Sequence, residues 1–244
     1  WDIYKEIFRF GWPLGINGCL TFLFLKIDRI MIGTMINPSA VAVYETASQM
    51  PGYIRMGYWS FQDVFFPNIA ELYEHNRIND IEKLLSYSLR MISFLCCFMF
   101  LITFIFKVEI ITLLFSEKYI DSSSLLPILT LSLCVALPSN IIGTSLVAIG
   151  QSGKPAIINT IDAIANVTGN LILIPLFGIH GAASATLVSR CLTNPINAWF
   201  LNQSGVQVDI SQYIKPLFAC LIVAGLGQFF NHKDLIFKTF DILL

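Results

Sequence analysis

The chain has few charged residues. Only 13% of its 244 residues are Asp, Glu, Lys or Arg, whereas an ordinary soluble domain has about 25%. Hydrophobic residues make up 55% of the sequence, and 20 of them are Phe. Too little polar surface is available to cover a water-soluble globule of this size. The composition therefore predicts an integral membrane protein.

The sequence also has no excess of positive or negative charge. Fifteen Lys and Arg face sixteen Asp and Glu, for a net charge of −1, so nothing indicates a basic surface for nucleic acid. No C-x-x-C pair and no spacing typical of metal ligands appears among the six cysteines and three histidines. We expect neither a metal nor a cofactor.

Catalytic motifs are absent from the sequence. It has no Gly-rich phosphate loop, no H-E-x-x-H and no G-x-S-x-G. A membrane enzyme such as a glycosyltransferase would need a carboxylate cluster at the membrane surface. The acids between residues 71 and 83 alternate with Lys and Arg instead. We therefore expect a polar passage rather than an enzyme.

Long apolar runs dominate what is present. A bilayer core of roughly 30 Å needs about 20 mostly apolar helical residues, and the runs lack the alternation of a membrane β-barrel. The fold class predicted is all-α, a polytopic transmembrane helix bundle. Seven spans are expected, at about residues 8–36, 40–69, 84–106, 124–149, 155–177, 181–201 and 213–230.

The connecting segments predict an orientation. Lys and Arg concentrate in cytoplasmic loops, and seven lie on the side of the N-terminus against three on the other side. The N-terminal end of this segment and the 71–83 loop are therefore predicted to be cytoplasmic, in a plasma or inner membrane.

Charges within the first two spans are the strongest functional signal, because a charge in a membrane helix usually faces a bundle interior or a wet cavity. Asp28 is either a cation or proton site or part of a salt bridge near the helix end. Arg55 has the planar fork that suits phosphate oxygens, and Trp59, one turn on, could stack on a sugar or isoprenoid. The alternative for Arg55 is an ion pair with Asp63 made through neighbouring helices.

A polar stripe follows the fifth span. Helical spacing places four polar side chains on one face, which indicates either a cavity wall or hydrogen-bonding contacts between helices. Asp162 is a second candidate for ion coupling. Arg190 in the sixth span is either a ligand contact or a partner in a salt bridge, for which Asp162 is the candidate. The stripe consists of Asn159, Asp162, Asn166 and Asn170.

Several segments together resemble the polysaccharide flippases of the Wzx type. Residues 28–33, D-R-I-M-I-G, resemble that family's D-x-x-M-[LI]-G, and residues 41–47 resemble the following G-x-Y-x-x-A, with Ala42 in place of Gly. Further similarity lies at residues 66–73, at 111–129 and, most fully, at 146–183. These motifs follow one another in the order and spacing of the family.

The resemblance implies one lobe of a two-lobed transporter of the multidrug/oligosaccharidyl-lipid/polysaccharide (MOP) superfamily. Residues 1–203 would form the second six-helix lobe, and residues 204–244 one further helix and the start of another. We expect the upstream lobe to belong to the same chain or to a partner. The function implied is flipping of a polyprenyl-diphosphate-linked oligosaccharide across the membrane.

Two sibling functions remain open at this point. A multidrug/cation antiporter should have a cavity rich in acidic and aromatic side chains, so two buried arginines argue against it. A flippase for a peptidoglycan precursor would share the need for cationic groups. The candidate cavity residues are Arg55, Trp59, Asp63, Asn159, Asp162, Asn166, Asn170 and Arg190, with Asp28 and Asp162 as candidates for ion coupling.

Overall fold

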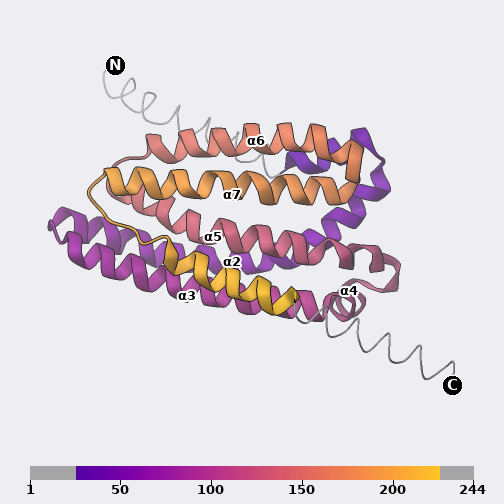
Figure 1. Ribbon diagram of the computed structural model, residues 1–244, viewed down its shortest axis with the longest axis horizontal. Coiled ribbons are helices and arrows are strands. Elements are labelled where there is room, and N and C mark those ends of the chain that lie inside the picture. The colour runs from indigo at the N-terminus through magenta and orange to yellow at the C-terminus, as the bar shows by residue number, and fades with distance from the viewer. Residues whose placement is uncertain (1–25, 226–244) are drawn as a thin grey trace, which may run out of the picture.

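A computed structural model of the protein describes residues 26–225, and these are almost entirely helical (Figure 1). Residues 26–35 are helical and lead into the long α2, whose first turn is capped by the Asn37 side chain and contains Pro38. The helices that follow residues 26–35 are α2 (Pro38–Glu74), α3 (Ile78–Ile105), α4 (Lys107–Phe115), the 3₁₀ helix η1 (Glu117–Ser124), α5 (Leu126–Ala148), α6 (Gly153–Phe177), α7 (Ile179–Gln203) and Ser211–Gly225.

The α5 helix lies at the centre of this arrangement. It contacts α2, α3, α6 and α7, and most of its side chains are buried. The antiparallel pair α6 and α7 runs along one side of it, and α3 with the C-terminal helix Ser211–Gly225 along the other (Figure 1). The α2 helix extends from the end of the α6–α7 pair to the side of α3. The described residues thus form the predicted all-α bundle.

Helix lengths agree with the expected spans, with two differences. Three described helices, α3, α5 and α6, are long and apolar enough to cross a membrane. The α2 helix has 37 residues, or roughly 55 Å at 1.5 Å per residue, so it extends beyond one bilayer core. The polar segment 71–83, expected as a loop, is helical except for the turn at residues 75–77. Most of the first span and the end of the seventh lie outside the described residues.

Small residues allow α6 and α7 to approach closely. A Cβ atom on Gly181 would lie 2.0 Å from the carbonyl oxygen of Leu173, and one on Gly169 would lie 3.0 Å from the Cβ of Ala185. The small residues of the Gly-Ala-Ala-Ser-Ala segment at 181–185 allow this close packing. This close pairing fixes which side chains of α6 and α7 meet.

Polar contacts tie the helix ends together. At one end, Lys154 donates to the carbonyl of Phe200 and to Ser204, and the Gln207 amide donates to Glu82. Ser211–Gly225 begins beside Asp209, and hydrogen bonds from Ser211 lower the pKa of that carboxyl group. The starts of α3 and α6 and the end of α7 therefore share one end of the bundle.

The opposite end is closed by α4 and η1. Ser122 donates to the carbonyl of Val43 in α2. The Ser124 hydroxyl lies 2.9 Å from Nε2 of His180, which is exposed. Since that hydroxyl already donates to the Asp121 carbonyl, His180 is the donor to it.

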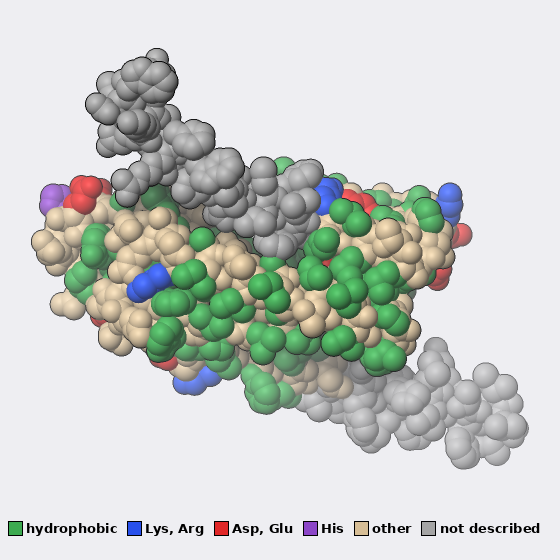
Figure 2. Space-filling model, turned by 90° about the horizontal axis from the view of Figure 1, so that it is seen from above, with side chains coloured by type: hydrophobic (Ala, Val, Ile, Leu, Met, Phe, Trp, Pro, Cys, Tyr) green, Lys and Arg blue, Asp and Glu red, His purple; other side chains and the backbone are tan. Residues whose placement is uncertain are grey.

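The face in Figure 2 is largely apolar. Hydrophobic side chains spread over the middle of the molecule, and charged side chains gather mainly toward the two ends of its long axis. Such a surface suits a bilayer, in which the hydrocarbon core contacts the middle and water contacts the ends.

Candidate substrate cavity

A polar cavity of about 240 Å³ lies between the residues that precede α2 and helices α2, α5, α6 and α7. Its wall combines four cationic side chains with two carboxylates, and the remaining polar groups are mainly Ser, Thr and Asn. The charged residues of the wall are Lys26, Asp28, Arg29, Arg55, Asp162 and Arg190. Five of the residues predicted from sequence thus line one cavity, namely Asp28, Arg55, Asp162, Asn166 and Arg190.

Asp28 is a buried carboxylate held by neutral donors. Tyr44 and Thr186 donate to its Oδ2 at 3.1 and 3.0 Å, and Asn170 donates to its Oδ1 at 2.7 Å. Within the described residues it forms no ion pair, because the neighbouring Arg29 pairs with Glu45. These contacts differ from the helix-end salt bridge that was one of the two expectations for Asp28.

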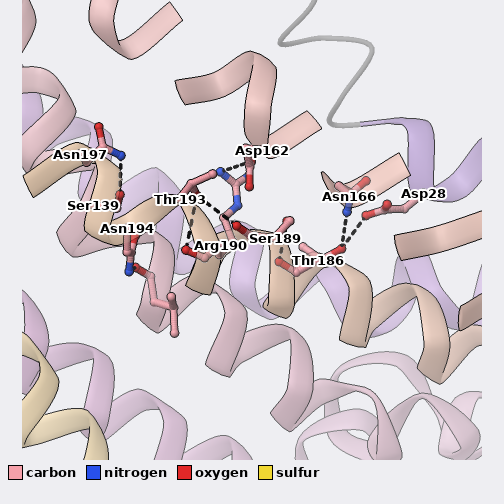
Figure 3. Close-up of polar contacts among 11 residues, drawn as sticks. Asp28, Ser139, Asp162, Asn166, Thr186, Ser189, Arg190, Thr193, Asn194 and Asn197 are labelled. Carbon is pink, nitrogen blue, oxygen red and sulfur yellow. Dashed lines mark hydrogen bonds and ion pairs between the residues drawn. The ribbon is translucent and has the colours of Figure 1, made fainter. Parts of the chain in front are cut away.

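Two polar contacts join α6 to α7 along the cavity (Figure 3). Nη1 of Arg190 lies 2.7 Å from Oδ2 of Asp162. Four residues forward on α6 and four back on α7, Asn166 donates to Thr186 at 3.1 Å. Thr186 in turn donates to Asp28, which precedes α2. The contacts that reach Asp28 therefore begin one helical turn from the Asp162–Arg190 ion pair.

Arg55 differs from the other arginines of the cavity. It forms no ion pair within the described residues, and its Nε is buried without a hydrogen-bond partner there. Its guanidinium lies 5.7 Å from the centre of the Trp59 ring, a cation–π distance. By contrast, Arg29 also donates to Ser48 at 3.1 Å. Among the described residues, Arg55 is thus a cavity cation that no carboxylate neutralises.

Three predicted residues lie away from the cavity. Trp59 and Asp63 are exposed on α2 beside a separate shallow groove, which they line with Gln62 and Phe66. Asp63 makes no ion pair with Arg55. Asn159 is exposed and does not line the cavity.

The polar stripe on α6 therefore divides into different environments. Asp162 and Asn166 face the cavity, whereas Asn170 is fully buried and donates to Asp28 and Asn166. Both the cavity wall and the interhelical hydrogen bonds expected from the stripe are present, and Asn166 takes part in both.

Sequence reasoning did not single out Tyr44 and Thr186, although both hold Asp28. Thr186 lies one helical turn before Arg190, so the same spacing argument could have placed it on the cavity face. Tyr44 precedes Ser48 and Arg55 on α2 by four and eleven residues, which also repeats one helical face.

A second group of buried polar contacts joins α7 to the centre of α5 (Figure 3). Asn194 donates to the carbonyl of Val135 at 2.9 Å, and Asn197 to the hydroxyl of Ser139 at 2.7 Å. Both contacts flank Pro138, which cannot donate a helical hydrogen bond. They secure the α5–α7 interface behind the cavity.

The sequence was compared with known protein families. The profile of a family described as polysaccharide biosynthesis protein matches residues 1–124, just over half of the 244 residues. The chain belongs to this polysaccharide biosynthesis protein family. Within it, the chain is 28% identical over 233 residues to a probable low-salt glycan biosynthesis flippase, Agl15, of Haloferax volcanii. That alignment covers 95% of the chain and 49% of the relative.

Solved structures confirm the fold of this family member. The lipid II flippase MurJ in an inward closed conformation matches with a TM-score of 0.67 at 17% identity, covering 92% of the chain and 48% of MurJ. A MOP-superfamily transporter from Pyrococcus furiosus matches with a TM-score of 0.68 at 16% identity, covering 92% of the chain and 52% of that protein.

These comparisons establish two points. The resemblance to polysaccharide flippases is confirmed by the family and by the relative Agl15, and the multi-pass membrane bundle has the fold of about half of a MOP-superfamily transporter. The chain spans about half the length of the curated relatives it matches.

Proposed function

We propose that this chain forms half of a transporter that flips a polyprenyl-diphosphate-linked oligosaccharide across a membrane for cell-surface polysaccharide synthesis. The observation that carries the proposal is the cavity, in which four cations outnumber two carboxylates. The excess positive charge suits a diphosphate, and the Ser, Thr and Asn side chains suit a hydrated sugar. The lipid chain would remain in the bilayer, against the apolar outer surface.

Arg55 is proposed to be the main anchor of the diphosphate. Its guanidinium has buried donor capacity that no described residue uses, and an unsatisfied buried donor is costly until a ligand reaches it. Arg190 would contribute a second cation from the facing α7. Trp59, Asp63 and Asn159 remain proposed contacts for distal parts of the substrate, because they lie outside this cavity. No catalytic reaction is proposed.

The lining argues against a drug antiporter. A site for cationic drugs should favour acids and aromatic rings, but Tyr44 is the only aromatic residue among the described residues of the cavity wall, and cations are in excess. A peptidoglycan-precursor flippase would use the same chemistry, so it is distinguished by the lipid that accumulates rather than by the cavity.

Asp28 is proposed to bind the coupling ion, a monovalent cation or a proton. Its carboxylate has only neutral partners within the described residues, and the nearby Asn170 Oδ1 is buried without a hydrogen-bond partner. Hard cations prefer oxygen ligands of this kind. Asp162, one turn of α6 from Asn166, which donates to the Thr186 that holds Asp28, is proposed as a second acid in the same coupling.

Neutralising Asp28 tests this role. We expect Asp28→Asn to lower the transport rate about tenfold, in the range of coupling free energies between two sites, and to remove its dependence on a sodium or proton gradient. The measurement is flipping of a labelled lipid-linked oligosaccharide in vesicles with and without each gradient. Asp121→Asn, on the exposed η1, is the control. Gradient dependence that persists in Asp28→Asn would contradict the proposal.

The partner and the orientation complete the proposal. A single lobe supplies one wall of a two-lobed cavity, so alternating access needs a second lobe, from the same chain or a partner. We propose that the α2–α3 turn at residues 75–77 is cytoplasmic, with the starts of α3 and α6. Cysteines introduced singly at Arg77 and at Lys118 should be labelled from opposite sides of the membrane.

Deleting the gene tests the function as a whole. A polyprenyl-diphosphate oligosaccharide should accumulate in lipid extracts analysed by mass spectrometry, and the surface polymer should be lost. The mass of the accumulated lipid would identify the sugar and would separate a polysaccharide precursor from a peptidoglycan precursor. An unchanged lipid-linked pool, with new sensitivity to cationic drugs, would favour the antiporter instead.

A further inference from the structure

The ion pair between Arg190 and Asp162 has the features of a contact that can open. It consists of one short contact, Nη1 to Oδ2 at 2.7 Å, although arginine and a carboxylate can form two parallel hydrogen bonds. The second carboxylate oxygen, Oδ1 of Asp162, is buried without a hydrogen-bond partner within the described residues. A pair of this kind recovers only part of the cost of desolvating its charges.

The solvent exposure of Arg190 and Asp162 also indicates that this ion pair can open. About a third of the Arg190 side chain, 34%, is exposed, whereas the Asp162 side chain is 13% exposed. Both residues line the same cavity as Arg55. An anion that enters the cavity can therefore approach Arg190 and compete with Asp162 for it, while the less exposed Asp162 stays on the wall.

The cavity arginines differ in what holds them. Arg29 is tied to Glu45 and to Ser48 on α2, and Glu45 is not among the residues that line the cavity. Arg55 has no carboxylate partner within the described residues. Arg190 is intermediate, since its one partner is a carboxylate that itself faces the cavity.

We propose that Asp162 is a displaceable counter-ion, which holds Arg190 in the empty cavity and gives it up to the diphosphate of the substrate. This inference rests on the proposed function. Phosphate oxygens compete with Asp162 for the guanidinium, and the two negative groups cannot both be satisfied by one Arg190. In the loaded cavity Asp162 loses its counter-charge, while Arg55 and Arg190 both hold the anion.

The exchange connects the anion to the proposed coupling site. Asp162 lies one turn of α6 from Asn166, which contacts Thr186 and through it Asp28. The other charges that line this cavity are Lys26 and Arg29. When Arg190 leaves Asp162, the unpaired Asp162 carboxylate lies on one side of Asn166 and Thr186, and the Asp28 carboxylate lies on the other. Substrate binding would thereby increase the affinity of the cavity for a cation, and linkage makes the effect reciprocal.

The test uses inorganic pyrophosphate as the probe and the intact transporter, meaning this chain with its second lobe, in detergent or nanodiscs. Because Arg190 no longer has to leave a carboxylate, Asp162→Asn should bind pyrophosphate more tightly by about tenfold, a coupling of ordinary size. The matched control is Asp80→Asn, which removes a carboxylate from an exposed ion pair with Arg77 and should leave the affinity unchanged.

A double-mutant cycle separates exchange from general charge. In an Arg190→Gln background, Asp162→Asn should change pyrophosphate affinity by no more than about twofold, since the competing pair no longer exists. An equal gain in both backgrounds would mean that Asp162 acts only through its charge, and would overturn the inference. An unchanged affinity in Asp162→Asn alone would also overturn it.

The remaining outcomes distinguish this inference from the proposed function. If neither the wild type nor any variant binds pyrophosphate, the cavity is not a diphosphate site and both proposals fail. If Asp162→Asn does not fold, the comparison of Arg190→Gln with Arg55→Gln tests the exchange instead. Arg190→Gln should then cost less pyrophosphate affinity than Arg55→Gln, because only Arg190 must give up a partner, and an equal or larger cost would overturn the exchange.

Discussion

Replacing Arg55 by glutamine is expected to reduce export of the lipid-linked oligosaccharide by at least about thirtyfold, as expected when one partner of a buried charged contact is removed. Arg55 lines the cavity, its Nε is buried, and no carboxylate of the described residues neutralises it. Its loss would remove the one cavity arginine that needs no rearrangement before it binds a diphosphate. Surface polymer and accumulated lipid-linked precursor, measured in the same cells, report the effect.

Two further variants define the reason for that loss. Arg55→Lys keeps the charge but not the planar fork, so an intermediate export level is expected. Arg77→Gln removes an exposed arginine from the α2–α3 turn and should leave export unchanged. Protein levels in the membrane must match the wild type. Normal export by Arg55→Gln at that level would exclude a role for Arg55 in holding the substrate.

Replacing Gly181 by alanine should lower the free energy of unfolding by about 3 kcal/mol, at the upper end of the usual cost of overpacking. The added Cβ would lie 2.0 Å from the carbonyl oxygen of Leu173 and 2.4 Å from its carbonyl carbon. Backbone atoms cannot turn away as a flexible side chain can, so α6 and α7 would have to separate. Thermal unfolding of the purified protein measures the loss.

The matched control is Gly57→Ala in α2, where the added Cβ would meet no heavy atom within 4 Å. There the substitution should be neutral or stabilising by about 0.5 kcal/mol, because alanine favours the helix. Gly169→Ala, with a contact of 3.0 Å to the Ala185 Cβ, should lie between the two. Equal stability of the Gly181 and Gly57 variants would show that the α6–α7 approach is looser than described.

The candidate cavity was only partly predictable from the sequence. Helical spacing correctly placed Asp162 and Asn166 on one face of α6, because that periodicity is a local property of the backbone. It also placed Trp59 and Asp63 on the face of Arg55. In the structure they lie beside a separate groove, since α2 is long enough for one stripe to meet different neighbours along its length.

Apart from the ion pair of Arg190 with Asp162, which was one of the two expectations for Arg190, partners across helices could not be read from local spacing. Asp28, Asn170 and Thr186 are more than 140 residues apart at the extremes, and only the packing of three helices brings them together. The same holds for Arg29, whose partner is Glu45 rather than the adjacent Asp28. Each helix obeys its own periodicity, but the rotation of one helix against another depends on contacts between distant side chains.

The sequence by itself determined that the protein is a helical membrane bundle, since a scarcity of charge and apolar runs long enough to cross a bilayer leave few other solutions. It also determined the family, through segments whose order and spacing persist along the chain. Only the tertiary structure decided which charged groups share a cavity and which of them are already paired. Those relations depend on the close approach of α6 to α7 at Gly181 and on the central position of α5, and such contacts arise only when the helices pack together.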